Sequence, residues 1–362
     1  MKNICFFISS FNEVGGTERV TSVIANEFQK LAGYQVHIVS LHCGIQPFFV
    51  LDDNVHIDQL FDNKLRGLTN FPKIMYCLRN YLKLHNIDTL IVVESILSIY
   101  SLPASLGLNI HHVCWEHFNY NIDLGKSTRR LARRLAARFS DDIVTLTERD
   151  KSMWLSRGNI KAKVTAIPNP ITIDLPENIN ISNNKTFLAV GRLTNQKGFD
   201  LLLQSWALIT DKHPDWRLRI VGDGEDKDIL EHMRMDLGIE NTTKLIDKTS
   251  HISDEYQKAS FFVMSSRFEG LPLVLIEAQA YGLPIISFDC DTGPSEIISN
   301  NINGWLCEPL NVKQLSQAML YAIDMSEDNE KYVKFCELSR VNAKRFTLDK
   351  VLFKWGEILE CK

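Results

Sequence analysis

Two cations lie in a glycine-bounded loop in the second half of the chain. The stretch 191–198 reads GRLTNQKG, with Arg192 and Lys197 five residues apart. Glycine at both ends lets the backbone turn and approach a ligand closely, and two cations over a helix start suit a diphosphate. A surface loop with solvated charges explains the same residues equally well. This loop in isolation therefore does not decide between the two interpretations.

Two glutamates further along the chain could bind hydroxyl groups. Glu269 and Glu277 are separated by seven residues, and Pro272 suits the first turn of the helix that carries Glu277. We expect both carboxylates to face the mouth of one cleft. There they would suit a hydroxyl-rich ligand, because charge-assisted hydrogen bonds contribute about 1.5–3 kcal/mol each. Two unrelated surface glutamates are the alternative.

The elements that position these loops follow a strand-helix rhythm. Short β-branched and aromatic runs alternate with helical periodicity, which is typical of parallel sheets whose ligands lie beyond the carboxyl ends of the strands. The first predicted helix buries one face, with apolar residues at Val20, Val23, Ile24, Phe28 and Leu31. We predict strands at residues 4–8, 36–41, 90–93, 112–115, 143–146, 164–167, 187–190, 218–221, 244–246, 261–264, 284–287 and 304–306.

Length and composition favour two globular domains. The chain has 362 residues, with 45% hydrophobic and 23% charged, which excludes disorder, collagen and coiled coil. Periodicity breaks at Ile167-Pro168-Asn169-Pro170 and in the polar stretch 177–185. We place the boundary there, giving domains 1–170 and 171–345, and expect residues 346–362 to form a helix that packs back on the first domain. The fold class is α/β, with two Rossmann-like parallel-sheet domains that face each other across a cleft.

Charge and apolar patterning bound the location and partners. The net charge of −4 argues against binding to nucleic acid. The two halves differ in charge, because residues 1–170 carry 19 Lys and Arg against 15 Asp and Glu, and residues 171–362 carry 21 against 29. This asymmetry suggests that the two halves have different partners. No apolar run approaches the roughly 20 residues of a membrane span, and the run 4–8 is too short for a signal peptide. We expect a cytoplasmic protein whose eight cysteines stay reduced.

Five groups of residues together resemble the retaining glycosyltransferases of family 4, the group 1 glycosyltransferases of bacterial polysaccharide biosynthesis, which have the GT-B architecture. The resemblance covers essentially the whole chain. The groups are Gly15-Gly16-Thr17-Glu18-Arg19, Gly191-Arg192-Leu193 with Lys197-Gly198, Gly222-Asp223-Gly224, Glu269-Gly270-Leu271-Pro272 leading to Glu277-Ala278, and Gly293-Pro294 with Glu296.

The resemblance implies an acceptor-binding first domain and a nucleotide-sugar-binding second domain. Arg192 and Lys197 are similar to the pair that neutralises the leaving diphosphate, Glu269 to the residue that holds donor-sugar hydroxyls, and Glu277 to the ribose ligand. The backbone of Gly270 and Leu271 would lie near the phosphate. The implied substrate-binding residues are Gly15, Gly16, Arg192, Lys197, Gly222, Glu269, Gly270, Leu271 and Glu277.

The resemblance also implies a histidine over the donor sugar. His117 is similar to it and joins Glu269, Arg192 and Lys197 as a predicted catalytic residue. His111, His112 and Glu116 are close by, so a capping or core histidine remains the alternative.

No metal or other cofactor is implied. Asp289-Cys290-Asp291 contains an Asp-x-Asp pair, but its neighbours match the family's Asp-Cys-x-x-Gly-Pro pattern, so we do not expect it to bind a metal. No residue is positioned as an obvious nucleophile. Retention then follows either from same-face internal return, which the resemblance favours, or from a nucleophile that the sequence does not reveal.

A basic helix is predicted at residues 126–139, KSTRRLARRLAARF. A helical wheel places its five arginines on one half and its leucine, alanine and phenylalanine side chains on the other. A core-packed helix with a solvated face is the plain interpretation. The hypothesis that we add is docking to an anionic membrane surface or to an acceptor carried on a lipid pyrophosphate, at about 1 kcal/mol per arginine.

These features predict a metal-independent, retaining hexosyltransferase. The donor would be a nucleotide sugar carrying a hexose or N-acetylhexosamine, UDP-linked by family tendency, and the acceptor a lipid-linked or growing glycan of capsule or O-antigen type. The enzyme would work at the inner face of the cytoplasmic membrane. Alternatives are a nucleotide-sugar epimerase of the same fold and a non-catalytic sugar-nucleotide binder. An NAD(P) oxidoreductase lacks support because no Gly-x-Gly-x-x-Gly occurs.

Overall fold

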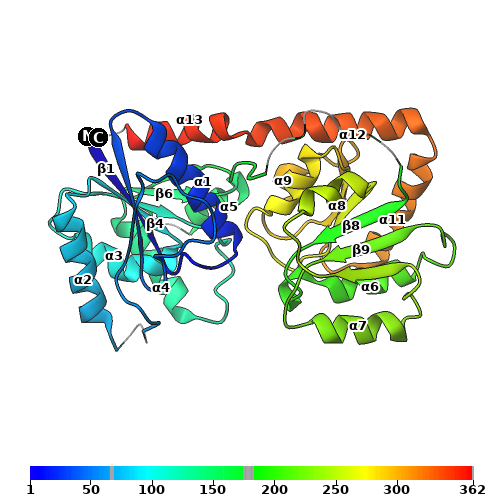
Figure 1. Ribbon diagram of the computed structural model, residues 1–362, viewed down its shortest axis with the longest axis horizontal. Coiled ribbons are helices and arrows are strands. Elements are labelled where there is room, and N and C mark those ends of the chain that lie inside the picture. Colours follow the sequence, from blue (N-terminus) through cyan, green and yellow to red (C-terminus); the bar gives the residue numbers. More distant parts are fainter. Residues whose placement is uncertain (66–68, 158, 174–175, 177–180, 182, 361–362) are drawn as a thin grey trace. The chain divides into compact units, whose positions relative to one another are not determined.

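The chain folds into two compact units (Figure 1). The computed structural model describes residues 1–65, 69–157, 159–173, 176, 181 and 183–360. The N-terminal unit comprises Met1–Thr172 together with Leu348–Lys362, and the C-terminal unit comprises Ile173–Thr347. Cys361 and most of the polar stretch 177–185 lie outside the described residues.

A parallel sheet forms the centre of the N-terminal unit. Its strand order is β3-β2-β1-β4-β5-β6-β7, and β1, β4 and β5 are buried along most of their length because helices cover both faces. The strands are β1 (Lys2–Ile8), β2 (Tyr34–Ser40), β3 (His56–Gln59), β4 (Thr89–Val93), β5 (His111–Trp115), β6 (Asp142–Thr145) and β7 (Lys163–Ala166).

The sequence patterns missed β3, an edge strand whose residues HIDQ are exposed or half-buried. An edge strand needs no continuous apolar run, so its sequence carries no strong strand pattern. Every strand that the sequence predicted is present in the structure, with ends displaced by no more than two residues.

Helices of the N-terminal unit bury aromatic side chains against the sheet. The ring of Trp355 lies 5.0 Å from that of Trp115 and 6.1 Å from that of Phe28, and Lys2 Nζ donates a hydrogen bond to the Leu359 carbonyl at 3.2 Å. Leu31 was expected on the buried face of the first helix, but it follows the last helical residue and is exposed. The helices are α1 (Gly16–Lys30), α2 (Phe71–Leu84), η1 (Ser95–Leu97), α3 (Ser98–Ser105), α4 (Ser127–Phe139), α5 (Glu148–Ser156) and α13 (Leu348–Leu359).

The C-terminal unit repeats this design with the strand order β10-β9-β8-β11-β12-β13. Its strands are β8 (Thr186–Val190), β9 (Arg217–Val221), β10 (Thr243–Ile246), β11 (Phe261–Met264), β12 (Ile285–Phe288) and β13 (Gly304–Cys307). Its helices are η2 (Asn195–Lys197), α6 (Phe199–Ala207), α7 (Lys227–Asp236), α8 (Ile252–Lys258), α9 (Leu273–Ala280), α10 (Pro294–Ile297), α11 (Val312–Ser326), α12 (Asn329–Ala343) and η3 (Lys344–Phe346).

Each sheet has a point where the direction of winding reverses. In the N-terminal sheet this point lies between β1 and β4, and in the C-terminal sheet between β8 and β11. Helix N-termini and loops diverge at the carboxyl ends of these strand pairs, which is where open parallel sheets bind ligands. The fold therefore predicts one binding edge in each unit.

The predicted orientation of the basic helix is wrong for two of its arginines and for two of its apolar residues. In α4 the buried residues are Arg129, Ala132, Arg133 and Ala136, while Leu131 is 50% and Phe139 65% exposed. The helical wheel assumed that apolar side chains face the core. Here two arginines face inward because α4 covers buried carboxylates, as described below.

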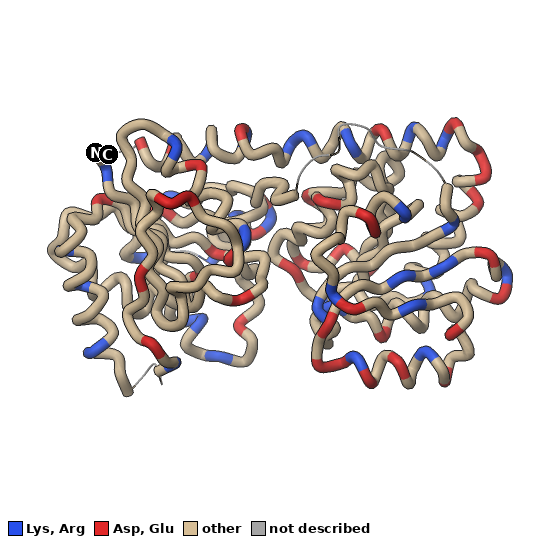
Figure 2. The backbone as a smooth tube through the Cα atoms, viewed as in Figure 1, with Lys and Arg blue, Asp and Glu red and all other residues tan. Residues whose placement is uncertain are grey.

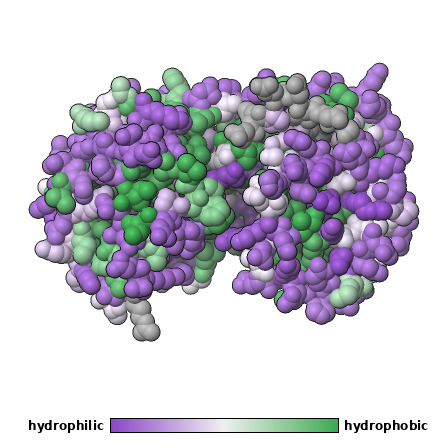
Figure 3. Space-filling model, viewed as in Figure 1, coloured by the Kyte–Doolittle hydropathy of each residue, from purple (hydrophilic) through white to green (hydrophobic). Residues whose placement is uncertain are grey.

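The exposed large apolar residues are distributed unevenly over the two units. Helix α7 carries acidic and basic residues along its length (Figure 2). Apolar side chains reach the surface in patches between hydrophilic ones (Figure 3), and most of the exposed large apolar residues belong to the N-terminal unit.

Candidate functional site

Three loops interlock at the carboxyl edge of the C-terminal sheet. After β8, the Gly191 amide donates to the Val221 carbonyl at 3.0 Å, and the Leu193 amide to the Asp223 carbonyl at 2.9 Å. A Cβ atom on Gly222 would lie 1.9 Å from the Gly191 carbonyl oxygen. Glycine is required at Gly222 because the two backbones touch there.

The loop after β8 is also fixed to the loop after β11. Gly198 has a φ of +64°, and a Cβ on it would lie 2.2 Å from the Ser265 carbonyl oxygen. Arg267 donates to both carboxylate oxygens of Asp200, at 2.8 and 2.7 Å. Arg267 and Asp200 were not among the predicted site residues, because nothing local in the sequence indicates that they pair. Their pairing holds Lys197 and Glu269 in adjacent loops.

Lys197 and Glu269 are in direct contact. Lys197 Nζ lies 2.7 Å from Glu269 Oε1, with side chains that are 18% and 8% exposed, respectively. Thr292 Oγ1 donates to the Glu269 carbonyl at 2.7 Å and so ties the loop after β12 to the same edge. Strand pairing explains the contact, because β8 and β11 are neighbours and each side chain follows the carboxyl end of its strand.

The other predicted residues of this unit lie around that pair. Arg192 is exposed, and its side chain makes no hydrogen bond or ion pair to the residues that the structure describes. Gly270 and Leu271 directly precede Pro272, the N-cap of α9. Glu277 is buried in α9, where its Oε2 accepts a hydrogen bond from the Tyr256 hydroxyl at 2.9 Å. The structure thus joins Lys197 to Glu269 directly and leaves Arg192 projecting into solvent.

The loop after β1 leads straight into α1 in the N-terminal unit. Gly15 is the N-cap and Gly16 the first helical residue, and the Gly15 carbonyl accepts from the Arg19 amide at 3.1 Å. A Cβ on Gly15 would lie 2.2 Å from a Glu18 carboxylate oxygen. The helix N-terminus and its backbone amides therefore stand at the carboxyl edge of the sheet.

His117 occupies the same edge, two residues after β5. Its ring lies 4.4 Å from that of Trp115, and burial lowers the pKa of His117 to about 3. Its Nε2 is buried and has no hydrogen-bond partner among the described residues. The imidazole is therefore neutral near pH 7.

His111 and His112 have structural partners instead. His111 Nε2 lies 2.7 Å from Asp142 Oδ2, and His112 Nε2 lies 2.9 Å from Ser101 Oγ. Both belong to β5 and are buried. Of the three histidines, only His117 lies in the loop beyond the strand.

A network of charged side chains lies next to the carboxyl edge of the N-terminal sheet. Glu116 is 1% exposed and accepts from Arg133 Nε at 3.1 Å and from the Ser95 hydroxyl. Arg129 donates to Glu94 Oε2 at 3.0 Å. These pairs explain why α4 turns two arginines inward, since an unpaired buried carboxylate would be strongly unfavourable. Sequence reasoning missed Glu94, whose position at the end of a predicted strand was the one available indication.

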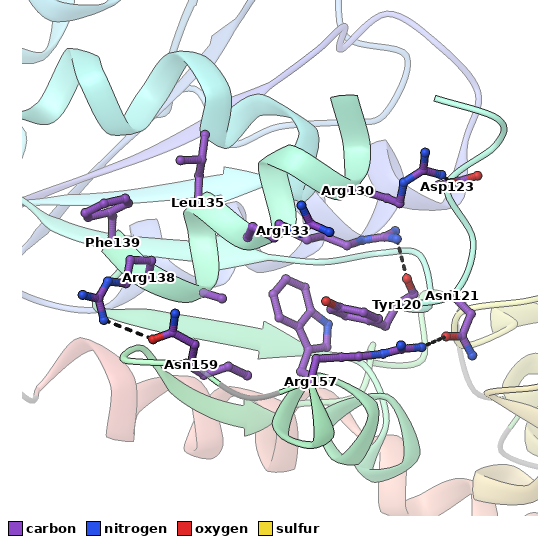
Figure 4. Close-up of a pocket in the computed structure, with 14 residues that line it drawn as sticks. Tyr120, Asn121, Asp123, Arg130, Arg133, Leu135, Arg138, Phe139, Arg157 and Asn159 are labelled. Carbon is purple, nitrogen blue, oxygen red and sulfur yellow. Dashed lines mark hydrogen bonds and ion pairs between the residues drawn. The ribbon is translucent and has the colours of Figure 1, made fainter. Parts of the chain in front are cut away.

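A cavity of about 520 Å³ lies beside α4 and α5 (Figure 4). Arg138 and Arg157 there donate to the side-chain carbonyls of Asn159 and Asn121, each at 3.3 Å, so their charges have neutral partners. Arg130 pairs with Asp123, and Arg133 donates to the Tyr120 carbonyl at 2.6 Å. The cavity is consequently cationic.

The described residues form neither a metal-binding cluster nor a membrane-spanning helix. No group of three or more His, Cys, Asp or Glu side chains there is arranged to hold a metal ion. Within the same residues, every helix is too short or too polar to cross a membrane.

Comparison with known proteins assigns the family. The model of glycosyl transferases group 1 matches residues 172–337, and that of glycosyltransferase family 4 matches residues 14–175. An uncharacterized glycosyltransferase of Haemophilus influenzae is 37% identical over 361 residues, covering 99% of this chain and 100% of that protein. The chain therefore belongs to the family 4, group 1 glycosyltransferases, as its sequence motifs predicted.

Other relatives have more specific names. The amylovoran biosynthesis glycosyltransferase AmsD of Erwinia amylovora is 29% identical and covers 99% of this chain and 100% of its own. A Campylobacter jejuni N-acetyl-D-galactosaminyltransferase is 27% identical, covers 84% of each chain, and is named for an acceptor glycan linked through PP to undecaprenol.

Solved structures show the GT-B fold predicted from the sequence. HepE of Anabaena in complex with UDP matches with a TM-score of 0.81 at 19% identity, covering all of both chains. The lipopolysaccharide outer core galactosyltransferase WaaB matches with a TM-score of 0.79 at 22% identity, covering 99% of each chain.

Proposed function

We propose that this glycosyltransferase transfers a hexose or N-acetylhexosamine, with retention and without a metal, from a UDP-sugar to a lipid-linked or growing cell-surface glycan. The contact between Lys197 and Glu269 carries the proposal. In this contact a cation that suits a leaving diphosphate lies beside a carboxylate that suits sugar hydroxyls, at the winding reversal of the C-terminal sheet. The solved relative with bound UDP and the relatives of polysaccharide synthesis support the donor and acceptor classes.

Charge explains the roles of the C-terminal residues. Departure of the diphosphate leaves negative charge on its oxygens, which Lys197 and the solvent-facing Arg192 stabilise, assisted by the backbone amides of Gly270 and Leu271. Glu269 accepts hydrogen bonds from donor-sugar hydroxyls. Glu277, held by Tyr256, binds the ribose. Gly222 lets the loop after β9 pack against the Gly191 carbonyl, so that the two loops together form the nucleotide site.

The sugar develops positive charge as the diphosphate leaves. A neutral His117 adds no repelling charge beside it and can donate or accept a hydrogen bond, which suits a residue over the donor sugar. The backbone amides at Gly15 and Gly16 serve the donor phosphate or the acceptor. Retention proceeds by same-face internal return, in which the leaving phosphate takes the acceptor proton as the new glycosidic bond forms.

The exposed face of α4 supports membrane docking. It presents Arg130, Arg134 and Arg138 next to the exposed Leu131 and Phe139, so cations and apolar side chains share one surface. Cations of this kind contribute about 1 kcal/mol each at an anionic membrane. We place the enzyme on the inner face of the cytoplasmic membrane, where an acceptor on a lipid pyrophosphate would be available.

Vesicle sedimentation tests the docking. The wild type should sediment with phosphatidylglycerol vesicles and release at high salt, and the triple variant R130Q/R134Q/R138Q should stay in the supernatant. K212Q/K227Q/K248Q, a charge-matched control in the C-terminal unit, should sediment like the wild type. If the wild type stays in the supernatant with anionic vesicles at low salt, the docking proposal is wrong.

Product analysis tests the reaction. The protein is incubated with EDTA, a panel of nucleotide sugars and an undecaprenyl-diphosphate-linked glycan extract, and the new linkage is assigned by NMR. We expect transfer from one UDP-sugar with the donor's anomeric configuration preserved. Donor conversion without an acceptor would show an epimerase, donor binding without any conversion a non-catalytic binder, and loss of transfer with EDTA a metal-dependent enzyme.

A further inference from the structure

Glu94 lies at the winding reversal of the N-terminal sheet. It is the first residue after β4, the strand that neighbours β1, and its amide donates to the Trp115 carbonyl at 2.8 Å. The loop after β1 enters α1 beside it, and Glu18 of α1 lies close enough to affect the charge of Glu94. Glu94 therefore occupies the position where a sheet of this topology binds its ligand.

The backbone of Glu94 is strained. Its φ is +76° with ψ at 130°, a region that residues with a Cβ rarely adopt. Glycine would avoid this strain, yet the chain carries a glutamate. Strain of this kind persists where the surrounding structure holds a functional side chain in place.

The carboxylate of Glu94 is oriented and reaches solvent. Arg129 Nη2 donates a hydrogen bond to Oε2 at 3.0 Å, and the Glu94 side chain remains 23% exposed. The guanidinium of Arg129 is itself fixed, with its carbon 4.5 Å from the centre of the Phe118 ring. Glu94 Oε1 has no hydrogen bond to the residues that the structure describes, so it is available to a ligand.

Glu116, the neighbouring carboxylate, is arranged differently. It is fully buried and accepts hydrogen bonds from Ser95, Arg133 and the Phe118 amide. Its role is structural because its oxygens are already occupied. Glu94 is thus the carboxylate of this cluster that can meet a hydroxyl group from outside.

We propose that Glu94 binds a hydroxyl group of the acceptor sugar, with Arg129 as the positioning residue for its carboxylate. The inference rests on the proposed glycosyl transfer and names the acceptor site that this transfer requires. The hydroxyl donates to Oε1, which orients the acceptor before it attacks the donor sugar. An acceptor that presents a sugar hydroxyl fits this site, whereas one that presents a phosphate there is repelled by the carboxylate.

Acceptor kinetics test the proposal. Glu94→Gln should raise the acceptor KM about tenfold or more, because a charged hydrogen-bond acceptor becomes a neutral one. The donor KM and acceptor-independent hydrolysis of the UDP-sugar should stay within about twofold of the wild type. The acceptor is the undecaprenyl-linked extract on which the wild type acts, titrated by dilution, and Glu148→Gln, on the exposed first turn of α5, is the matched control.

The outcomes separate the two proposals. A wild type without transfer overturns the proposed function itself. Transfer by the wild type with an unchanged acceptor KM in Glu94→Gln overturns only the role of Glu94, as would an equal loss of donor hydrolysis. A melting temperature of Glu94→Gln within about 2 °C of the wild type shows that the comparison concerns folded protein.

A pH profile provides an independent readout. Burial raises the pKa of Glu94 to about 7, an effect that Glu116 and Glu18 increase and Arg129 opposes. The acceptor KM of the wild type should therefore rise as the pH falls through 7, while that of Glu94→Gln stays level. Arg129→Gln should move the inflection to higher pH. A purely structural Glu94 would give the two proteins the same profile.

Discussion

The two units build their binding edges by different means. In the C-terminal unit the edge consists of loops whose backbones touch at glycine, as at Gly222 and Gly198, and these loops hold Lys197 and Glu269 in contact. In the N-terminal unit it rests on buried charges contributed by strand ends and by α4. Close backbone contact demands glycine at fixed positions and so leaves a motif in the sequence. Buried ion pairs demand only that opposite charges meet after folding.

If buried ion pairs support the binding edge of the N-terminal unit, the largest loss of stability is expected on replacing Arg133. Its replacement by methionine should lower the free energy of unfolding of the N-terminal unit by about 3–5 kcal/mol, because the Glu116 carboxylate would be buried without its partner. Urea unfolding followed by tryptophan fluorescence measures the loss. Arg134→Met, on the exposed face of the same helix, should change it by less than about 0.5 kcal/mol. Equal values for the two variants would show that the buried charges do not support this edge.

In the C-terminal unit the largest effect should be catalytic. Lys197→Ala is expected to lower kcat by about 10²–10³-fold, because the lysine meets charge that grows in the transition state. Steady-state rates with saturating donor and acceptor measure the change. Lys185→Ala, which removes an exposed ion pair with Asp215, is the control and should retain activity. A defect of Lys197→Ala confined to KM would contradict the assignment.

Glu277→Gln should have a smaller effect than Lys197→Ala. A ribose contact is equally strong in the ground state and the transition state, so we expect the donor KM to rise about tenfold and kcat to change by less than about twofold. Tyr256→Phe removes the hydroxyl that holds Glu277 and should raise the donor KM by less than Glu277→Gln. Initial rates measured over a donor titration give the donor KM and kcat of both variants. A larger fall in kcat for Glu277→Gln than for Lys197→Ala would reverse the proposed roles.

The last expected effect is a gradual one and concerns the pH dependence of the N-terminal unit. Burial raises the pKa of Asp150 to about 7. The folded state therefore holds a proton that the unfolded state releases near pH 4, so Asp150 makes stability fall as the pH rises between those values. Asp150→Asn should remove this slope, about 1 kcal/mol per pH unit, in urea titrations from pH 4.5 to 6.5. Parallel profiles for variant and wild type would contradict it.

Sequence patterns predicted most of the fold but failed at particular elements. The buried strands, β1 and β8 among them, have continuous apolar runs and were found, whereas the edge strand β3 was not. The helix at 126–139 was found, but two of its five arginines, Arg129 and Arg133, face inward, whereas periodicity alone assigns every arginine to solvent. Three histidines also lie close together in the sequence, and the sequence alone did not show which of them could face a ligand. The structure shows that His111 and His112 belong to β5, whereas His117 follows the end of that strand.

The residues of the candidate site also fall into two groups, those that the sequence indicated and those that it did not. The Gly191–Gly198 and Glu269–Glu277 segments could be selected because each is continuous in sequence and matches a family motif. Glu94, Arg129 and Arg267 could not, because their partners are 35 or more residues away along the chain. No local pattern distinguishes such residues from solvated surface charges.

The family, the α/β class and the positions that need glycine could all be recognised in the sequence, since periodicity and backbone geometry are local properties. Three features could be seen only in the folded chain: which arginines of α4 turn inward, the contact between Lys197 and Glu269, and the strained, partly exposed Glu94. These outcomes depend on which buried charges come within a few ångströms of each other. Folding, and not the order of residues alone, sets those distances.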